Sequence, residues 1–164
     1  MCGIVGIVGS GLLSGAERSC VQHMADAIVH RGPDDEGFHY EEQAVLGMRR
    51  LSIIDLDGGQ QPIYNEDKTV WLVCNGEIYN YRQTREMLKA RGHTMRCDSD
   101  AEVVVHLYEE FGAAFVEHLD GMFAVALWDS RKRRLHLVRD RLGIKPVYYT
   151  INKGTLAFAS EAKA

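Results

Sequence analysis

The sequence predicts an α+β fold in which two packed antiparallel sheets carry helices on their outer faces. Short strand-like runs joined by tight turns fill the last third of the chain, two helical segments lie in the middle, and another helical segment follows a strand-like run at the N-terminus. Sheets and helices must bury their apolar faces against one another, so two stacked sheets with outer helices are the economical arrangement for this many strands. The pattern alone leaves the strand order open.

The N-terminal third begins with a strand and a helix. Residues 4–8 are apolar and mostly β-branched, which is typical of a strand. Ser14 and Glu17 have the spacing of a capping box, and apolar residues at helical spacing follow them. We expect this helix to end near His30, because Pro33 disfavours helical geometry in the residue before it.

The middle of the chain predicts three strands and a helix. Segments 37–40 and 44–48 form a short antiparallel pair, and the strongly apolar segment 69–74 is a third strand. A helix over 81–91 ends at Gly92, which suits the left-handed position after a helix.

The last part predicts one more helix and a block of strands. Val103, Val104, Leu107 and Phe111 make the apolar stripe of a helix over 100–111. Short turns then separate four apolar segments that we expect to be strands: 122–128, 135–139, 147–151 and 156–160.

Length and composition predict one ordinary globular domain over residues 1–164. Hydrophobic residues make up 46% and charged residues 26%, and no apolar run is long enough to span a bilayer. A net charge of −4 with a pI near 6.0 gives no reason to expect nucleic acid or a membrane surface as a partner. The four cysteines form no C-x-x-C pair, so we expect a reducing, cytoplasmic setting.

The second residue is the first candidate for chemistry. Removal of Met1 would leave Cys2 with a thiol and a free α-amine, and the amine could serve as the base that activates the thiol. A small residue after an initiator methionine explains Cys2 equally well. The assignment therefore depends on the residues that follow.

Three further positions have two interpretations each. Asn75-Gly76 is a strong hairpin signal, but a side-chain amide beside a glycine N–H also suits an oxyanion hole, and we slightly favour the hole. Arg50 could bind a carboxylate, although a lone arginine is more often a surface residue. Asp100 could cap a helix or bind an ammonium group. The seven histidines show no paired ligand spacing, so no metal is expected.

Several ordered motifs, read together, resemble one known family. They are Cys2-Gly3-Ile4-Val5-Gly6, His30-Arg31-Gly32-Pro33-Asp34, Arg50-Leu51-Ser52-Ile53-Ile54, Gln61-Pro62-Ile63-Tyr64-Asn65, Asn75-Gly76-Glu77-Ile78-Tyr79-Asn80, Ser99-Asp100-x-Glu102, Asp120-Gly121-Met122-Phe123-Ala124 and Arg139-Asp140-x-x-Gly143-x-Lys145-Pro146. This set resembles the glutaminase domain of class II glutamine amidotransferases, which are N-terminal nucleophile hydrolases. Within them it is most similar to the glutaminase domain of glutamine-hydrolysing asparagine synthetases.

The resemblance implies a four-layer αββα sandwich and a role for each motif. Cys2 would be the nucleophile with its own α-amine as base, and the Asn75 side chain and Gly76 N–H would form the oxyanion hole. The implied substrate-binding residues are Arg50 for the α-carboxylate, Leu51, Ile53 and Ile54 for the wall beside it, Glu77 and Asp100 for the α-amino group, and Arg31 and Gly32, with Pro33, for a loop closing over the pocket.

The resemblance also implies a reaction and a partner. Through a Cys2 thioester, L-glutamine would be hydrolysed to glutamate and ammonia, and the ammonia would supply an ATP-dependent asparagine synthetase domain that is absent from this chain. No cofactor or metal is expected in this domain, while ATP and Mg²⁺ belong to the synthetase domain, in cis or in trans. Two alternatives stay open: a different acceptor, such as an amino-sugar or aspartate analogue, or a glutamine-binding regulatory module without catalysis.

Overall fold

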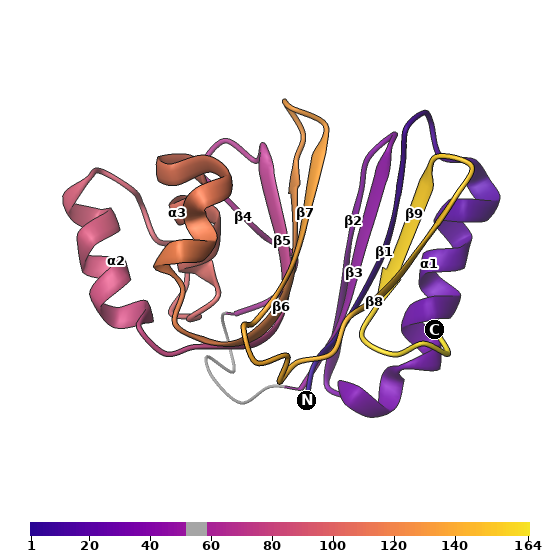
Figure 1. Ribbon diagram of the computed structural model, residues 1–164, viewed down its shortest axis with the longest axis horizontal. Coiled ribbons are helices and arrows are strands. Elements are labelled where there is room, and N and C mark those ends of the chain that lie inside the picture. The colour runs from indigo at the N-terminus through magenta and orange to yellow at the C-terminus, as the bar shows by residue number, and fades with distance from the viewer. Residues whose placement is uncertain (52–58) are drawn as a thin grey trace.

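Two antiparallel sheets lie face to face between helical layers in the computed structural model, which describes residues 1–51 and 59–164 (Figure 1). Helix α1 (Gly15–Ala27) covers the outer face of one sheet, and α2 (Tyr81–Ala90) and α3 (Glu102–Phe111) cover the other. This arrangement confirms the predicted α+β class and the αββα layering. Within the described ranges, no helix is both long and apolar enough to cross a membrane.

The first sheet is formed mainly by the two ends of the chain. In spatial order its described strands are β2 (Asp35–Tyr40), β3 (Ala44–Arg50), β1 (Gly3–Gly9), β9 (Thr155–Ala159) and β8 (Tyr148–Asn152). The predicted capping box of α1 is present, since the Glu17 N–H donates to Ser14 Oγ at 3.2 Å and the Ser14 N–H donates to Glu17 Oε2 at 2.8 Å. The helix ends at Ala27, and a 3₁₀ turn (Val29–Arg31) continues it to about the predicted boundary.

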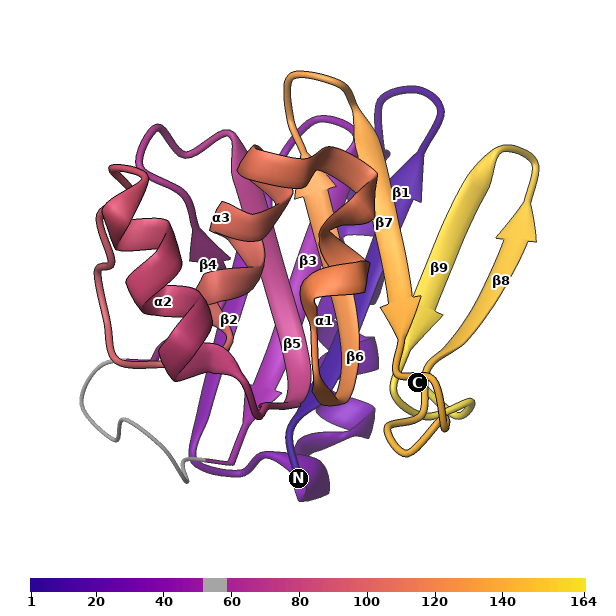
Figure 2. The same cartoon turned by 60° about the vertical axis from the view of Figure 1, so that its left-hand side comes forward.

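The second sheet is formed by the middle of the chain. Its described strands, in spatial order, are β4 (Ile63–Tyr64), β5 (Val70–Ile78), β6 (Gly121–Asp129) and β7 (Arg134–Arg139). Figure 2 shows α3 lying across the outer face of this sheet, followed by a 3₁₀ segment (Gly112–His118). The short strand β4 and the 3₁₀ segment were not among the predicted elements.

Strand β5 corrects one expectation from the sequence. The prediction ended this strand at Cys74, before the hairpin signal of Asn75-Gly76, whereas β5 continues through Asn75-Gly76 to Ile78. The reason is the close approach of β6: a Cβ atom on Gly76 would lie 2.1 Å from the Met122 carbonyl oxygen. Gly76 therefore allows two long strands to stay paired where the local sequence favours a turn.

Apolar side chains fill the space between each pair of layers. Between the two sheets lie buried residues of both, including Ile4 and Met48 from the first and Val73 and Trp128 from the second. Separate apolar clusters bury α1 on the first sheet and the middle helices on the second. The polar residues that the sequence singled out, among them Arg50, Asn75 and Asp100, lie together at one end of the sandwich.

Strand register brings the N-terminus to that end. Strand β1 runs antiparallel to β3 with Gly3 opposite Arg49, so the chain enters the sheet at Cys2 beside the last residue of β3, Arg50. This pairing brings the second and fiftieth residues of the chain together without any local sequence signal.

Candidate active site

A cavity of about 130 Å³ lies at this end of the sandwich, between the start of β1, the end of β3 and the second half of β5. Seven of the residues singled out from the sequence line it: Cys2, Arg50, Leu51, Asn75, Gly76, Glu77 and Asp100. Arg31 and Gly32 are not part of this lining. Ile53 and Ile54 lie outside the described residues.

The Cys2 thiol is half-buried and held by the chain just after β3. Its Sγ accepts a hydrogen bond from the Leu51 N–H at 3.4 Å and lies 3.6 Å from the Leu51 carbonyl oxygen, to which it can donate. These are weak hydrogen bonds, so they orient the thiol at the cavity wall and leave it available to react.

Arg31 and Gly32 lie outside the cavity and contact the backbone of Cys2 and of the end of β3. The Arg31 Nε–H donates to the Cys2 carbonyl oxygen at 3.0 Å, and its Nη1 lies 3.1 Å from Glu161 Oε1. Hydrogen bonds from His30 and then Arg31 hold the pKa of Glu161 down at about 2. A Cβ on Gly32 would lie 2.5 Å from the Arg50 backbone nitrogen, so only glycine fits against this end of β3.

Asn75 has an unused hydrogen-bond donor. Its side chain is 1% exposed, and its Nδ2 has no hydrogen-bond partner among the described residues. A buried donor without a partner costs about 1–3 kcal/mol, so such a group is expected to serve a ligand. Asn75 lines the same cavity as the Cys2 thiol, and Gly76 beside it leaves backbone exposed to that space.

Asp100 joins the helical layer to β5. Its Oδ2 accepts a hydrogen bond from the Ile78 N–H at 2.6 Å, and the side chain is 7% exposed. Burial raises the pKa of Asp100, with the nearby Glu77 carboxylate adding to the effect, although backbone hydrogen bonds oppose it. The helix-capping role is not observed, because α3 begins at Glu102 with Ala101 at its cap.

A second thiol in the lining is chemically different from the first. Cys74 lies in β5 and is buried in the apolar cluster beneath the middle helices, and this burial raises the pKa of its thiol far above the ordinary range. A thiol must lose its proton to become a good nucleophile. Cys2 is therefore the only one of the two suited to react with a molecule in the cavity.

Among the lining residues that the sequence analysis did not single out, two polar side chains make contacts within the site. Lys145 is 7% exposed, and its Nζ lies 3.4 Å from Met1 Sδ. The Gln61 side chain bonds both backbone groups of Cys74: Oε1 accepts from N–H at 2.6 Å and Nε2 donates to the carbonyl oxygen at 3.1 Å. Both residues lie in the family motifs quoted above, and this was the signal in the sequence that could have identified them as site residues.

The lining as a whole combines complementary chemical groups. It offers a thiol, a buried amide donor, the Arg50 guanidinium and the carboxylates of Glu77 and Asp100. Such a set suits a small molecule with an electrophilic carbonyl carbon, one negative group and one positive group. In the described ranges, the group of histidines and carboxylates whose spacing could hold a metal ion lies outside this cavity.

Comparison with known proteins gives consistent matches. Residues 1–164 match the family model described as the glutamine amidotransferase domain. The whole chain is 48% identical to the glutamine-hydrolyzing asparagine synthetase 2 of Bacillus subtilis (strain 168) and 47% identical to the glutamine-hydrolyzing asparagine synthetase 3 of Arabidopsis thaliana. It spans only 22% and 28% of these curated relatives.

A solved structure gives the same architecture. Glutamine phosphoribosylpyrophosphate amidotransferase from B. subtilis, complexed with ADP and GMP, superposes with a TM-score of 0.79 at 18% identity. The match covers 99% of this chain and 42% of that one. At this identity the likeness establishes the fold alone.

Proposed function

The chain belongs to the glutamine amidotransferase domain family, and from this premise we propose that it hydrolyses the side-chain amide of L-glutamine to glutamate and ammonia. The observation that carries the proposal is the unpartnered Nδ2 of Asn75, buried in the cavity that also contains the Cys2 thiol. A buried donor beside a nucleophile suits a reaction in which negative charge develops on a carbonyl oxygen.

The proposed reaction begins after Met1 has been removed. The free α-amine of Cys2 takes the thiol proton, and the thiolate attacks the amide carbon of glutamine. Asn75 Nδ2 and the Gly76 N–H stabilise the oxyanion that forms. The amine then gives its proton to the departing ammonia, which leaves a thioester on Cys2. Water, deprotonated by the same amine, attacks the thioester and releases glutamate and the thiol.

The charged residues of the cavity supply recognition of the amino-acid group. We assign Arg50 to the α-carboxylate of glutamine, because a guanidinium can bind a carboxylate through two parallel hydrogen bonds. We assign Glu77 and Asp100 to the α-ammonium group. Holding both ends of the amino acid would orient the side-chain amide toward Cys2 and exclude simple amides.

The ammonia acceptor is proposed from the relatives. Because those relatives are named as glutamine-hydrolyzing asparagine synthetases and this chain spans 22–28% of their length, we propose that its ammonia supplies an asparagine synthetase domain, which would use ATP and Mg²⁺. Figure 2 shows β8 at the edge of its sheet. Exposed apolar side chains on β8 and in the loop before it support a docked partner domain. They are Leu142, Ile144, Tyr148, Tyr149 and Ile151, each more than half exposed. Four free cysteines support a reducing, cytoplasmic setting.

Covalent labelling tests the assignment of the nucleophile. A diazo-ketone analogue of glutamine should add one covalent mass to the wild-type chain, on the N-terminal peptide, and none to Cys2→Ala. The same Cys2→Ala variant should fold normally and release no ammonia from glutamine. Labelling at Cys20, Cys74 or Cys97, or ammonia release by Cys2→Ala, would contradict the proposal. Glutamine binding by the wild-type chain without ammonia release would favour the non-catalytic alternative.

A further inference from the structure

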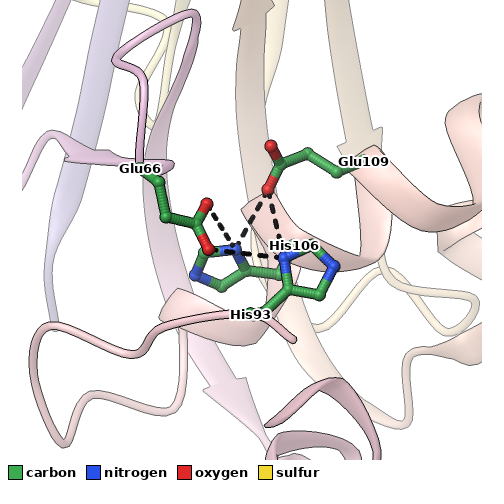
Figure 3. A group of neighbouring side chains, drawn as sticks. All are labelled: Glu66, His93, His106 and Glu109. Atoms are coloured by element: carbon green, nitrogen blue, oxygen red, sulfur yellow. Dashed lines mark hydrogen bonds and ion pairs between the residues drawn. The ribbon is translucent and has the colours of Figure 1, made fainter. Parts of the chain in front are cut away.

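Two histidines and two glutamates meet on the helical side of the second sheet (Figure 3). Glu66 comes from the turn between β4 and β5, His93 from the segment after α2, and His106 and Glu109 from consecutive turns of α3. We call these four residues the outer cluster. None of them lines the cavity that contains Cys2, so their arrangement is independent of the proposed activity.

The donor atoms of the outer cluster surround a common point. His106 Nδ1 lies 3.0 Å from Glu109 Oε2 and 3.4 Å from Glu66 Oε2. His93 Nδ1 lies 3.5 Å from Glu66 Oε1 and 3.6 Å from Glu109 Oε2. One donor atom from each of the four side chains lies within 4.8 Å of the others.

These separations are close to those of a tetrahedral metal site. Zinc binds imidazole nitrogen and carboxylate oxygen at about 2.0–2.2 Å, which places neighbouring ligand atoms about 3.3 Å apart. Two imidazoles with two carboxylates form a ligand set that suits zinc, whereas magnesium and calcium prefer oxygen alone. Four protein ligands without an open position are typical of a structural site rather than a catalytic one.

Neighbouring groups hold the ligands in orientation. Asn65 Nδ2 donates to Glu109 Oε1 at 2.7 Å, and the Thr94 N–H donates to Glu66 Oε1 at 2.9 Å. The other ring nitrogen of His93, Nε2, lies 3.1 Å from a carboxylate oxygen of Glu110. A carboxylate behind a histidine is a common outer layer of metal sites, because it fixes the tautomer and the plane of the ring.

The burial and charge of the outer cluster also suit a cation. The His106 ring is 1% exposed, and its polar contacts in the described ranges all involve Nδ1, the nitrogen that faces the two carboxylates. Glu66 and Glu109 are partly exposed, which leaves a path for an ion to enter. One divalent cation would neutralise both carboxylates and use the lone pairs of both rings.

We propose that Glu66, His93, His106 and Glu109 bind a zinc-class divalent cation that ties the β4–β5 turn and the segment after α2 to helix α3. This differs from the sequence expectation of no metal. The sequence contains no paired ligand motif because the ligands come from three separate elements, and only His106 and Glu109 are close in the chain.

Calorimetric titration of the untagged, metal-free chain with Zn²⁺ tests this proposal. We expect one zinc ion per chain, and a rise in melting temperature when zinc is added, because zinc would bind the folded state only. Glu66→Gln and His93→Gln should each lower the affinity at least tenfold and remove the rise in melting temperature. Neither residue lies within a helix or a strand, so these variants should fold.

Two controls separate the outer cluster from other zinc ligands. Cys2→Ala removes the accessible thiol of the cavity and should still bind one zinc ion. His39→Gln alters a similar pair elsewhere, in which His39 Nε2 lies 2.9 Å from Glu41 Oε1, and should bind zinc like the wild-type chain. The proposal is overturned if no zinc binds, or if Glu66→Gln and His93→Gln bind zinc as tightly as the wild-type chain. The four residues would then be an ion-pair network only.

Discussion

The cavity and the outer cluster both contain polar side chains within an apolar sandwich. They differ in whether those side chains have hydrogen-bonding or ionic partners within the protein. In the cavity, Asn75 Nδ2 has no partner in the described ranges, and the Lys145 ammonium lies against a thioether. In the outer cluster, each ring nitrogen that faces inward lies 3.0–3.6 Å from two carboxylates.

This difference separates two uses of polar groups. A substrate that is replaced at every turnover needs donors that folding leaves unpaired, whereas a site that fixes the fold can be assembled from groups that attract one another. Substitutions in the cavity should therefore reduce activity with little change in stability. Substitutions in the outer cluster should reduce stability with little change in activity.

The largest expected effect comes from the N-terminal residue. With Met1 attached, the Cys2 nitrogen is an amide without useful basicity, and Met1 itself lines the cavity. Since a positioned base contributes roughly 10²–10⁴-fold, a chain that keeps Met1 should hydrolyse glutamine negligibly, with an unchanged melting temperature. Intact mass and ammonia release on two preparations, one beginning at Met1 and one at Cys2, measure this. Equal turnover would show that another group is the base.

Removing the unpaired donor should give the next largest effect. Asn75→Ala is expected to lower kcat by roughly 10²–10³-fold with a smaller change in KM, because the oxyanion exists only near the transition state. Loss of a donor that has no described partner should change the melting temperature little. Steady-state kinetics and thermal unfolding on the same samples check both statements. Unfolding at a much lower temperature with kcat retained would make Asn75 a structural residue.

Arg50→Lys should affect binding rather than the chemical step. Lysine keeps the positive charge but cannot make two parallel hydrogen bonds to a carboxylate. Losing one hydrogen bond to a charged group costs about 1.5–3 kcal/mol, so KM for glutamine should rise roughly tenfold to a hundredfold. The kcat should stay within a fewfold of the wild-type value. An equal loss of kcat in this variant and in Asn75→Ala would contradict the separate roles.

The two regions also differ in how far the sequence could predict them. The cavity residues lie in short contiguous motifs, and Cys2, Arg50 and Asn75 were each found next to a predicted strand. The sequence did not predict that Gly3 pairs with Arg49, because register depends on the whole sheet. The extension of β5 through Gly76 was also missed, since the neighbouring strand overrides the local turn preference.

The residues missed were those whose roles depend on distant segments. Gln61 is a surface-type residue by sequence, yet from the segment before β4 it bonds the backbone of Cys74 in β5. Lys145 is buried although lysine is rarely buried, because the loop that Asp140 organises turns it toward the cavity. In the outer cluster, Glu66 and His106 are forty residues apart, and only the packing of α3 on the β4–β5 turn brings them together.

The smallest expected effect concerns Glu161, a paired group behind the cavity. It accepts hydrogen bonds from His30 and from Arg31, whose Nε–H holds the Cys2 carbonyl oxygen. The pKa of Glu161 is about 2 in the folded chain, below the ordinary value of about 4.5. A lowered folded pKa means that the charged carboxylate stabilises the fold above pH 4.5. That contribution is lost as the pH falls from about 4.5 to about 2.

Glu161→Gln should therefore lower the free energy of unfolding at pH 7 by less than about 1 kcal/mol, because the pair is partly exposed to solvent. The gap between wild type and variant should close as the pH falls through that window, which chemical denaturation at a series of pH values measures. Glu42→Gln, a change at an exposed glutamate, is the matched control and should show no such gap. A gap that persisted at pH 2 would mean that the variant loses packing rather than charge. In that case the charge of Glu161 would not stabilise the fold, and its pairing with His30 and Arg31 would be a contact between neighbours without a measurable electrostatic contribution.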